Sequence, residues 1–387
     1  MILWLLPGLV ATPCAVFTAE VLLGVNAQEP AKPRPASGRP QVAVLVPAHN
    51  EEQGIAKTVS LLVSQLQAND FVLVIADNCT DATARIAREA GARVVERNDP
   101  SRRGKGYALA FGVKSLVDSA PDVVVIVDAD CEIAPGGLEQ LATLCAAADR
   151  PVQADYVMVV PPDASVGARV SAFAFRVRNR LRPRGLAAVG MPCHLAGTGM
   201  AFPWEVLRDA PALDGHITED LMLGLELSLR GKAPIYCRSA HVVSDLAKTS
   251  AGQDTQRERW EHGHLSLIRS HLPRLLGGAV AKGKPELLAT ALDLCVPPLV
   301  LLGLGVGAAG ATSLLGVAFG VVGPALLAGV EAGAFVGAIG LAWKAEGSDL
   351  LSARDLTYAP YYVLRKIPSY VRVLLGRAEQ QWRRTER

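Results

Sequence analysis

Short apolar runs alternate with amphipathic stretches over the first two thirds of the chain. The runs are rich in Val, Ile and Ala, and they lie at residues 42–46, 71–76, 92–96 and 123–130. Continuous apolar runs of this length are typical of strands that are covered on both faces. Helical character follows two of them, at Glu52–Gln67 and Asp81–Ala90. The alternation predicts a doubly wound α/β domain, in which ligands gather at the carboxyl ends of the strands.

The first apolar segment precedes this domain. Residues 2–24 contain one charged residue, Glu20, and their length is close to the ~20 residues that a membrane-spanning helix requires. Val25-Asn26-Ala27 suits a signal-peptide cleavage site, but no Lys or Arg precedes the apolar run. Residues 1–27 are therefore expected to be an uncleaved anchor. Residues 28–40 are rich in Pro and Ala and carry basic residues, so they predict an extended cytosolic linker.

A second apolar segment follows the α/β domain, which is expected to occupy residues 41–280. Residues 286–344 are long enough for a hairpin of two spanning helices, with the turn near Gly307–Ser313. Basic residues on both sides of the hairpin predict that both flanks are cytosolic. Residues 345–387 mix apolar, aromatic and basic side chains, which indicates an amphipathic helix at the membrane surface or, alternatively, a soluble amphipathic helix.

Composition narrows the class of protein further. Half of the 387 residues are hydrophobic, which is more than one core would bury. Part of the chain is therefore expected to lie in a membrane. The formal net charge of +2 is too small to indicate a basic surface for nucleic acid, so no nucleic-acid partner is expected. The seven cysteines are odd in number and form no CxxC pair, which argues against a disulfide framework or a zinc site and fits a reducing cytosol.

Two carboxylates follow the fourth predicted strand. Asp128 and Asp130 are two residues apart, so on an extended chain they share a face. Just beyond a strand they can meet a hard divalent cation and diphosphate oxygens. Mg²⁺ or Mn²⁺ held there can neutralise charge on a departing nucleoside diphosphate. Taken alone, the pattern fits a solvated turn equally well.

Three further loops carry polar residues that suit a nucleotide. In residues 47–52 (PAHNEE) Asn50 can simply cap the following helix. Asp77, in the ADNCTD segment, can accept hydrogen bonds from a ribose or a base edge, although an Asx turn explains it as well. The basic loop Arg102–Gly106 contains Lys105 and can approach phosphates, with a solvated turn as the alternative.

Two later motifs suit an acceptor site. Thr218-Glu219-Asp220 precedes a helical stretch, so Thr218 can cap that helix or Asp220 can serve as a general base. In Gln256–Trp260 (QRERW), Trp260 can stack on a sugar ring and Arg259 can contact diphosphate. A surface helix with a half-buried Trp is the simpler interpretation of that segment.

Together and in this order, these motifs resemble those of family 2 inverting glycosyltransferases. The resemblance is closest to the membrane-integrated branch that contains cellulose, chitin, hyaluronan and poly-N-acetylglucosamine synthases, and it covers roughly residues 41–270. The pairing of TED with QRERW is its most specific part. The resemblance implies a GT-A fold, a Rossmann-like mixed α/β sheet, beside an N-terminal transmembrane helix and a C-terminal transmembrane hairpin.

The same resemblance implies roles for individual residues. Asp77 is expected to contact the nucleotide base and Glu51 to lie near the ribose, and Asp220 is expected to be the catalytic base. The other donor-side residues implied are Pro47, His49, Lys105 and Asp128. Asp128 and Asp130 are the implied metal ligands. The residues implied at the acceptor and diphosphate are Glu219, Gln256, Arg259 and Trp260.

The expected function is therefore transfer of a sugar from a nucleotide donor to a glycan or lipid-linked acceptor. The expected place is the cytosolic face of a bacterial plasma membrane, in cell-surface or exopolysaccharide synthesis, with membrane lipids and polysaccharide-export proteins as partners. Ala76 and Cys79 depart from the family pattern and leave base selectivity open. Two C-terminal spans are fewer than in channel-forming synthases, so single-sugar transfer stays open too. The alternatives are a polyprenyl-phosphate glycosyltransferase, which QRERW disfavours, and a catalytically silent nucleotide-binding scaffold.

Overall fold

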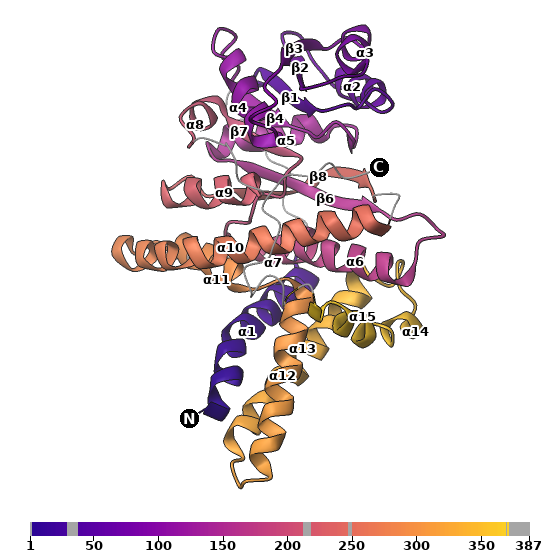
Figure 1. The fold of residues 1–387 in the computed structure, drawn as a ribbon. Helices are drawn as coiled ribbons and strands as arrows, with labels where there is room; N and C mark the ends of the chain where they lie inside the picture. Colours follow the sequence, from indigo (N-terminus) through magenta and orange to yellow (C-terminus); the bar gives the residue numbers. More distant parts are fainter. Residues whose placement is uncertain (1, 29–37, 212–217, 247–249, 369, 371–387) are drawn as a thin grey trace.

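The structure is a computed structural model that describes residues 2–28, 38–211, 218–246, 250–368 and 370. An eight-stranded sheet forms its centre (Figure 1). The strands are β1 Val42–Ala48, β2 Phe71–Asp77, β3 Arg93–Arg97, β4 Val123–Ile126, β5 Cys131–Ile133, β6 Val152–Val159, β7 Met200–Pro203 and β8 Ile235–Asp245. Their spatial order is β3-β2-β1-β4-β7-β6-β8-β5. The first four are mutually parallel and β7 is antiparallel to both neighbours, so the predicted mixed α/β sheet is confirmed.

Alternate residues of the central strands enter two separate cores. Val44 and Val46 of β1 pack under α2 Ile55–Val63, α3 Thr83–Glu89 and α5 Gly137–Ala148. Ala43 and Leu45 face the opposite side, where α4 Lys105–Ser115, α8 Trp204–Arg208 and α9 Glu219–Leu229 cover the sheet. Helices on both faces explain why these strands are continuously apolar in sequence.

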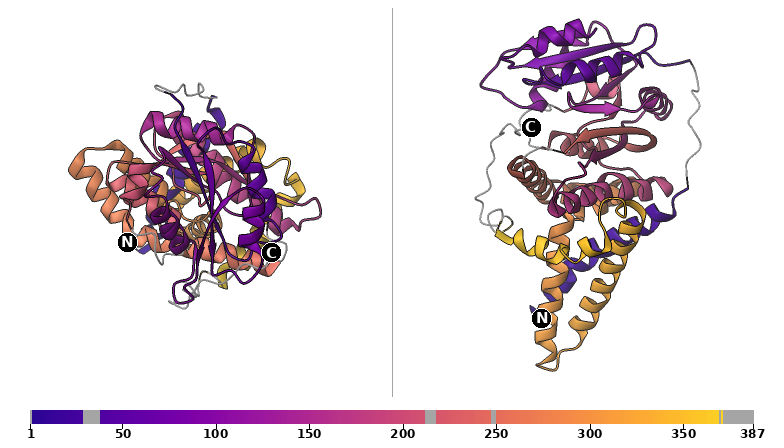
Figure 2. Two further views of the ribbon diagram at one scale, coloured as in Figure 1. Left: turned by 90° about the horizontal axis from the view of Figure 1, so that it is seen from above. Right: turned by 90° about the vertical axis from the view of Figure 1, so that its right-hand side faces the viewer.

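The remaining helices lie below the sheet in Figure 1. They are α6 Val166–Arg176, the π-helical turn η2 Val177–Leu181, α7 Arg182–Ala188, α10 Ser250–Lys282, α11 Pro285–Cys295, α14 Ala353–Leu356 and α15 Ala359–Arg365. Beneath them project α1 Leu5–Asn26, preceded by the short 3₁₀ turn η1 Ile2–Trp4, and the pair α12 Leu299–Val317 and α13 Gly323–Glu346 (Figure 2).

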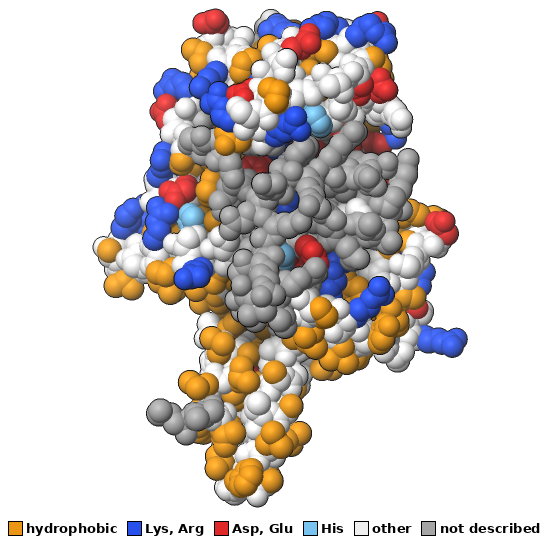
Figure 3. Space-filling view, viewed as in Figure 1, with side chains coloured by type: hydrophobic (Ala, Val, Ile, Leu, Met, Phe, Trp, Pro, Cys, Tyr) orange, Lys and Arg blue, Asp and Glu red, His pale blue; other side chains and the backbone are white. Residues whose placement is uncertain are grey.

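Among the described residues, three helices are long and apolar enough to cross a membrane: α1, α12 and α13. On the face shown in Figure 3, hydrophobic side chains are spread along the projecting helices, with scarcely any charged side chain among them. Phe319, at the tip, is 84% exposed, and Leu314 and Val330 are similarly exposed. Large apolar side chains exposed over a contiguous region are typical of a surface that faces lipid.

The hairpin differs from the expectation in two respects. Its first spanning helix begins at Leu299, after Pro297 and Pro298, rather than at residue 286. The earlier segment forms α11, whose apolar face is buried against leucines of α9 and α10. The turn lies at residues 318–322, with Gly320 at a φ of 78°, rather than at Gly307–Ser313. Small residues are compatible with the interior of a spanning helix, and those at 307–313 continue α12.

The predicted amphipathic tail, residues 345–387, lies partly outside the described residues. Its described part contains the single turn α14, with a capping box between Ser352 and Asp355, and α15. The single long amphipathic helix therefore stays a prediction.

The helix α1 is joined tightly to the α/β domain. A side chain at Gly24 would collide with the Leu181 carbonyl, and one at Gly185 would collide with the Glu20 carbonyl, so the helix backbones are in direct contact. Beside this contact the Arg182 guanidinium donates to the Glu20 carboxylate at 2.6 Å and also pairs with Asp293 of α11. Because all three side chains are buried, the network ties α1, α7 and α11 together.

Candidate active site

Asp128 and Asp130 lie in the turn that connects β4 to β5. The Thr58 hydroxyl donates to the Ala129 carbonyl at 2.7 Å, and the Asp128 N–H donates to the Thr198 hydroxyl at 3.1 Å. These bonds fix the turn from both sides of the sheet. One oxygen from each carboxylate and the Cys131 sulfur lie within 4.8 Å of one another.

The donor set fits a hard divalent cation. Carboxylate oxygens are the ligands that Mg²⁺ and Mn²⁺ prefer. Burial raises the pKa of the Cys131 thiol well above its ordinary value, and the charges of Asp130 and Asp128 raise it further. The sulfur therefore stays protonated beside the two carboxylates, which leaves the oxygens as the ligands of such a site.

Lys105, the first residue of α4, lies among these acidic groups. Its Nζ is 2.5 Å from Asp128 Oδ1 and donates to the Gly197 carbonyl at 2.6 Å. Burial alone would lower the pKa of Lys105, but the carboxylates of Asp128 and Glu219 hold it above its ordinary value. Its contacts in the structure are Asp128 and Gly197, and the predicted contact with the nucleotide stays a prediction.

Asp220 lies near the same lysine, beside Gly197. A Cβ built on Gly197, whose φ is +91°, would lie 3.3 Å from Asp220 Oδ2 and 3.7 Å from Lys105 Nζ. Residues 128 and 220 therefore approach one cation from two different elements, although 92 positions separate them in sequence. We call the group formed by Asp128, Glu219, Asp220 and Lys105 the carboxylate cluster.

Burial disfavours ionisation of the two acids that begin α9. It raises the pKa of Glu219 to about 7, with the neighbouring charge of Asp220 as the next cause. Burial also raises the pKa of Asp220, while the positive charges of Lys105 and Arg178 counteract the shift. A carboxylate whose pKa is raised toward neutrality is a stronger base than one in water.

Thr218 holds the start of α9 against α10. It occupies the N-cap position of α9, but its side chain makes no cap hydrogen bond. A side chain at Gly263 of α10 would collide with the Thr218 side chain, so the two helices meet at this glycine. The capping interpretation of Thr218 is therefore wrong for its side chain, which packs between helices instead.

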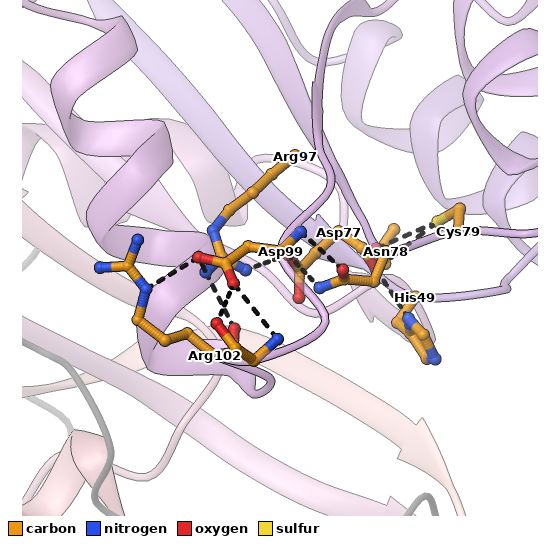
Figure 4. A network of polar contacts seen from close by, with 9 residues as sticks. His49, Asp77, Asn78, Cys79, Arg97, Asp99 and Arg102 are labelled. Atoms are coloured by element: carbon orange, nitrogen blue, oxygen red, sulfur yellow. Dashed lines mark hydrogen bonds and ion pairs between the residues drawn. The ribbon is translucent and has the colours of Figure 1, made fainter.

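Asp77 ends β2 and is part of a polar network shown in Figure 4. Arg97 Nη1 donates to Asp77 Oδ1 at 2.5 Å, and Asn78 Nδ2 donates to the same oxygen at 3.0 Å. Arg97 also pairs with Asp99 at 3.3 Å. Sequence reasoning missed Arg97. The signal was its place at the end of β3, where it lies directly opposite Asp77 in the strand register.

The residues of the PAHNEE segment lie beside this network. Pro47 pairs in register with Ile75 of β2, and the His49 ring nitrogen Nδ1 is 2.6 Å from the Asp77 carbonyl oxygen. The Glu51 N–H donates to the Thr83 hydroxyl at 2.8 Å. The structure therefore brings Pro47, His49 and Glu51 to the end of β2 where Asp77 lies.

The QRERW residues lie on α10, on the side of the domain that faces the three candidate spans. Gln256 and Trp260 line a cavity between α10, α6 and the start of α12. The Trp260 ring packs on Phe175, with 5.7 Å between centroids, and Arg259 is half-buried on the same helix. Arg178 of η2, which sequence reasoning also missed, lines this cavity too.

A mixed α/β sheet with paired carboxylates at a strand end is an arrangement in which α/β proteins bind ligands and metal ions. Residues 40–263, more than half of the chain, match the family described as Glycosyltransferase like family 2. The chain belongs to this family of glycosyltransferases.

Individual relatives agree with this assignment. An uncharacterized glycosyltransferase of Mycobacterium tuberculosis is 32% identical over 196 residues, which are 46% of this chain and 82% of that protein. The 4,4'-diaponeurosporenoate glycosyltransferase of Staphylococcus haemolyticus is 34% identical over 106 residues, 26% of this chain. The chain matches only 27% of that relative's own length.

A solved structure shows the same fold over nearly the whole chain. A mannosyltransferase from Pyrobaculum calidifontis, solved in complex with GDP-Man and Mn²⁺, superimposes with a TM-score of 0.57. The two are 20% identical, and the comparison covers 97% of this chain and 100% of the other. Together with the family match, this confirms the predicted GT-A fold class.

Proposed function

We propose that the chain is an inverting glycosyltransferase that moves a sugar from a nucleoside diphosphate donor to an acceptor hydroxyl. One observation carries the proposal: Asp128 and Asp220 approach Lys105 from different elements, across Gly197. A metal-type site and a buried carboxylate of raised pKa are thereby brought close together, as a single displacement requires.

Asp128 and Asp130 would hold Mg²⁺ or Mn²⁺. The choice is supported by the donor set and by the neighbour of similar fold that was solved with Mn²⁺. When bound, such a cation neutralises negative charge on the diphosphate leaving group. Lys105 then has a second use, because release from Asp128 frees its ammonium for a phosphate oxygen.

Asp220 is the proposed base. Its carboxylate takes the proton of the acceptor hydroxyl as that oxygen bonds to the anomeric carbon, and the bond from this carbon to the diphosphate oxygen breaks. The electron pair leaves with the nucleoside diphosphate. Attack from the face opposite the leaving group inverts the configuration, so an α-linked donor gives a β-linked product. Glu219 shares the buried negative charge and tunes the basicity of Asp220.

The nucleotide is proposed to bind at the ends of β1 and β2. Asp77 would accept from the base or ribose through the oxygen that Arg97 does not occupy, with Pro47, His49 and Glu51 lining the same site. Gln256, Arg259 and Trp260 of α10 would act on the acceptor side, near the diphosphate.

The domain arrangement supports a membrane enzyme. We assign residues 1–27 as an anchor, 28–40 as a linker, 41–280 as the catalytic domain, the α12–α13 pair as a spanning hairpin and residues 345–387 as an interfacial tail. Nucleotide sugars are cytosolic, so the catalytic domain would face the cytosol of a bacterial plasma membrane. A role in cell-surface polysaccharide synthesis, beside export proteins, follows from this placement.

The experiment is a donor panel. Detergent-solubilised full chain is incubated with nucleotide sugars, Mn²⁺ or Mg²⁺ and a bacterial lipid extract, and release of nucleoside diphosphate is followed. We expect one donor to be consumed, with loss of at least about 100-fold in rate on chelation or in Asp130→Asn. No release from any donor, with donor binding intact, would favour the silent scaffold instead.

A further inference from the structure

One loop, residues 195–199, contacts both the metal side and the base side of the carboxylate cluster. Its Thr198 hydroxyl accepts from the Asp128 N–H at 3.1 Å. A Cβ built on the neighbouring Gly197 would lie 3.3 Å from Asp220 Oδ2. The position of this loop therefore helps to set the separation between the metal-type site and the proposed base.

The backbone of this loop leaves the sheet at Gly199. The strands β6 and β7 pair over two residues each, and the Ala154 N–H then donates to the Gly199 carbonyl at 2.8 Å. Gly199 has a φ of +63°, and a Cβ there would lie 2.7 Å from side-chain atoms of Ala154 and Val242. A residue without a side chain is needed for this close approach, and the β6–β7 pairing ends at it.

The side chain of Gln153, on β6, bonds to the loop beyond the end of the strand pairing. Its Oε1 accepts from the Ala196 N–H at 2.8 Å, and its Nε2 donates to the Thr198 carbonyl at 2.9 Å. Nε2 also donates to the carbonyl of the adjacent Ala154 at 3.0 Å. Because one backbone partner is a donor and the other two are acceptors, they fix the orientation of the amide.

Burial makes this glutamine unusual. Gln153 is 2% exposed, and its neighbours Val152 and Ala154 belong to the core under α2, α3 and α5, so Gln153 points to the opposite face of the sheet. Glutamine lies mostly at protein surfaces, and an apolar side chain fills a buried position without needing polar partners. Two of the three hydrogen bonds of Gln153 go to the loop, so the loop accounts for the buried amide.

We propose that Gln153 is a positioning residue of the transferase. It holds the loop so that Thr198 keeps the turn of Asp128, and the Gly197 carbonyl keeps the Lys105 ammonium, in place for the reaction. Gln153 acts through the loop and not by contact with the sugar. This inference rests on the proposed function, because it names a further residue on which the same site depends.

The expected consequence of losing the amide is a slower reaction rather than weaker donor binding. Without Gln153, the Ala196 N–H and the Thr198 carbonyl lose their partner, and the loop must shift to satisfy them. A displacement of about 1 Å at reacting groups can reduce a rate about 100-fold. The turn of the metal-type site keeps its other bond, from the Thr58 hydroxyl to the Ala129 carbonyl, so the donor and its cation should still bind.

The test compares Gln153→Met, which keeps the size of the side chain and removes its hydrogen bonds, with Tyr236→Phe. Tyr236 lies opposite Gln153 in the register of β6 and β8 and is also buried, but its hydroxyl donates to Asp155 rather than to the loop. Purified full chain in detergent is assayed with the nucleotide sugar consumed in the donor panel. We expect kcat to fall at least about tenfold in Gln153→Met, with KM for the donor within about threefold, and wild-type kinetics in Tyr236→Phe.

A double-mutant cycle separates positioning from a general loss of stability. Thr198→Val removes the hydroxyl that accepts from the Asp128 N–H. If Gln153 acts through the loop, Gln153→Met should reduce kcat at least about threefold less in the Thr198→Val background than in the wild type. Thermal unfolding is measured in parallel. If Gln153→Met does not fold, Gln153→Asn replaces it, because this variant keeps the amide but is one methylene too short to reach both loop partners.

A wild-type kcat in the Gln153 variants, or an equal loss of kcat in Tyr236→Phe, would overturn the proposal. So would effects of Gln153→Met and Thr198→Val that simply add. Failure of the proposed function gives a different result, because the wild type would then consume no donor or Asp220→Asn would turn over normally. If Asp220→Asn is inactive and the Gln153 variants turn over normally, only the positioning inference fails.

Discussion

The part of the protein that we propose to bind the donor, around the ends of β1 and β2 (the donor half), and the part beside the candidate spans (the membrane-facing half) are built from contacts of different range. In the donor half, Asp77 meets Arg97 20 residues away and Glu51 meets Thr83 32 residues away, across neighbouring parallel strands. In the membrane-facing half, Arg182 meets Glu20 162 residues away and Asp293 111 residues away. The first kind of contact follows from strand order, whereas the second requires three helices to arrive at one place.

Because of this difference, mutations in the donor half should act mainly on ligand binding, and mutations in the membrane-facing half mainly on folding. The Asp77–Arg97 pair of the donor half is nearly as buried, but it holds polar loops at strand ends, so changes there should act on ligand affinity as well as on stability. The Glu20–Arg182–Asp293 network is buried, and its loss should act on stability before it acts on catalysis. The carboxylate cluster is one place where the two halves meet.

The largest expected effect is a loss of stability on mutation of the membrane-facing half. Arg182→Ala leaves two acidic side chains buried without their cation, and we expect a loss of about 3–5 kcal/mol in the free energy of unfolding. Arg85→Ala is the matched control, because Arg85 and Glu89 form an exposed pair on α3. It should cost less than about 1 kcal/mol. Similar denaturation midpoints for both variants would remove the distinction.

Next is the place where the halves meet. Lys105→Ala removes the cation between Asp128 and Asp220, and we expect the transfer rate to fall about 10- to 100-fold. Lys114→Ala, on the exposed last turn of the same helix, should transfer at the wild-type rate. Steady-state release of nucleoside diphosphate measures both. Equal rates in the two variants would mean that Lys105 is only a structural contact.

A smaller effect is expected within the donor half. Arg97→Ala leaves the buried Asp77 without its guanidinium partner, so donor affinity should fall about tenfold and the free energy of unfolding should fall as well. Arg88→Ala, which breaks an exposed pair with Glu96, is the control. Calorimetric titration with the nucleotide measures this. A loss of stability without a loss of affinity would assign Arg97 to the fold alone.

The smallest effect concerns pH. A base acts in its ionised form, and burial raises the pKa of the base Asp220 above its ordinary value, so transfer should fall on the acid side at a higher pH than for a carboxylate in water. Glu219→Gln removes the neighbouring negative charge, which makes Asp220 easier to ionise, and should move this acid limb to lower pH. The pH profile of kcat/KM reports the shift. A limb that stays in place would exclude coupling between the two carboxylates.

The sequence predicts the donor half well because its elements are local. Apolar runs identified β1 to β4, and the polar residues that follow them, Asp77 and Asp128, lie at strand ends as the pattern requires. Arg97 was missed because only the register between β2 and β3 places it opposite Asp77.

The membrane-facing half was predicted less well. The segment 285–295 has the composition of a span, and only its packing on α9 and α10 shows otherwise. The position of Arg178 is set by a π-helical turn, and the spacing of hydrophobic residues in the sequence does not predict such a turn. The approach of Asp220 to Asp128 was expected from family resemblance rather than from spacing, because it depends on how α9 crosses the sheet.

The most direct test of the central claim compares donor binding with transfer in Asp220→Asn. We expect the affinity for the nucleotide sugar with Mn²⁺ to stay within about twofold of wild type, while transfer falls about 10²- to 10⁴-fold. Turnover at the wild-type rate would contradict the account. Loss of Mn²⁺ and donor binding in the same proportion as transfer would also contradict it, because Asp220 would then belong to the donor site.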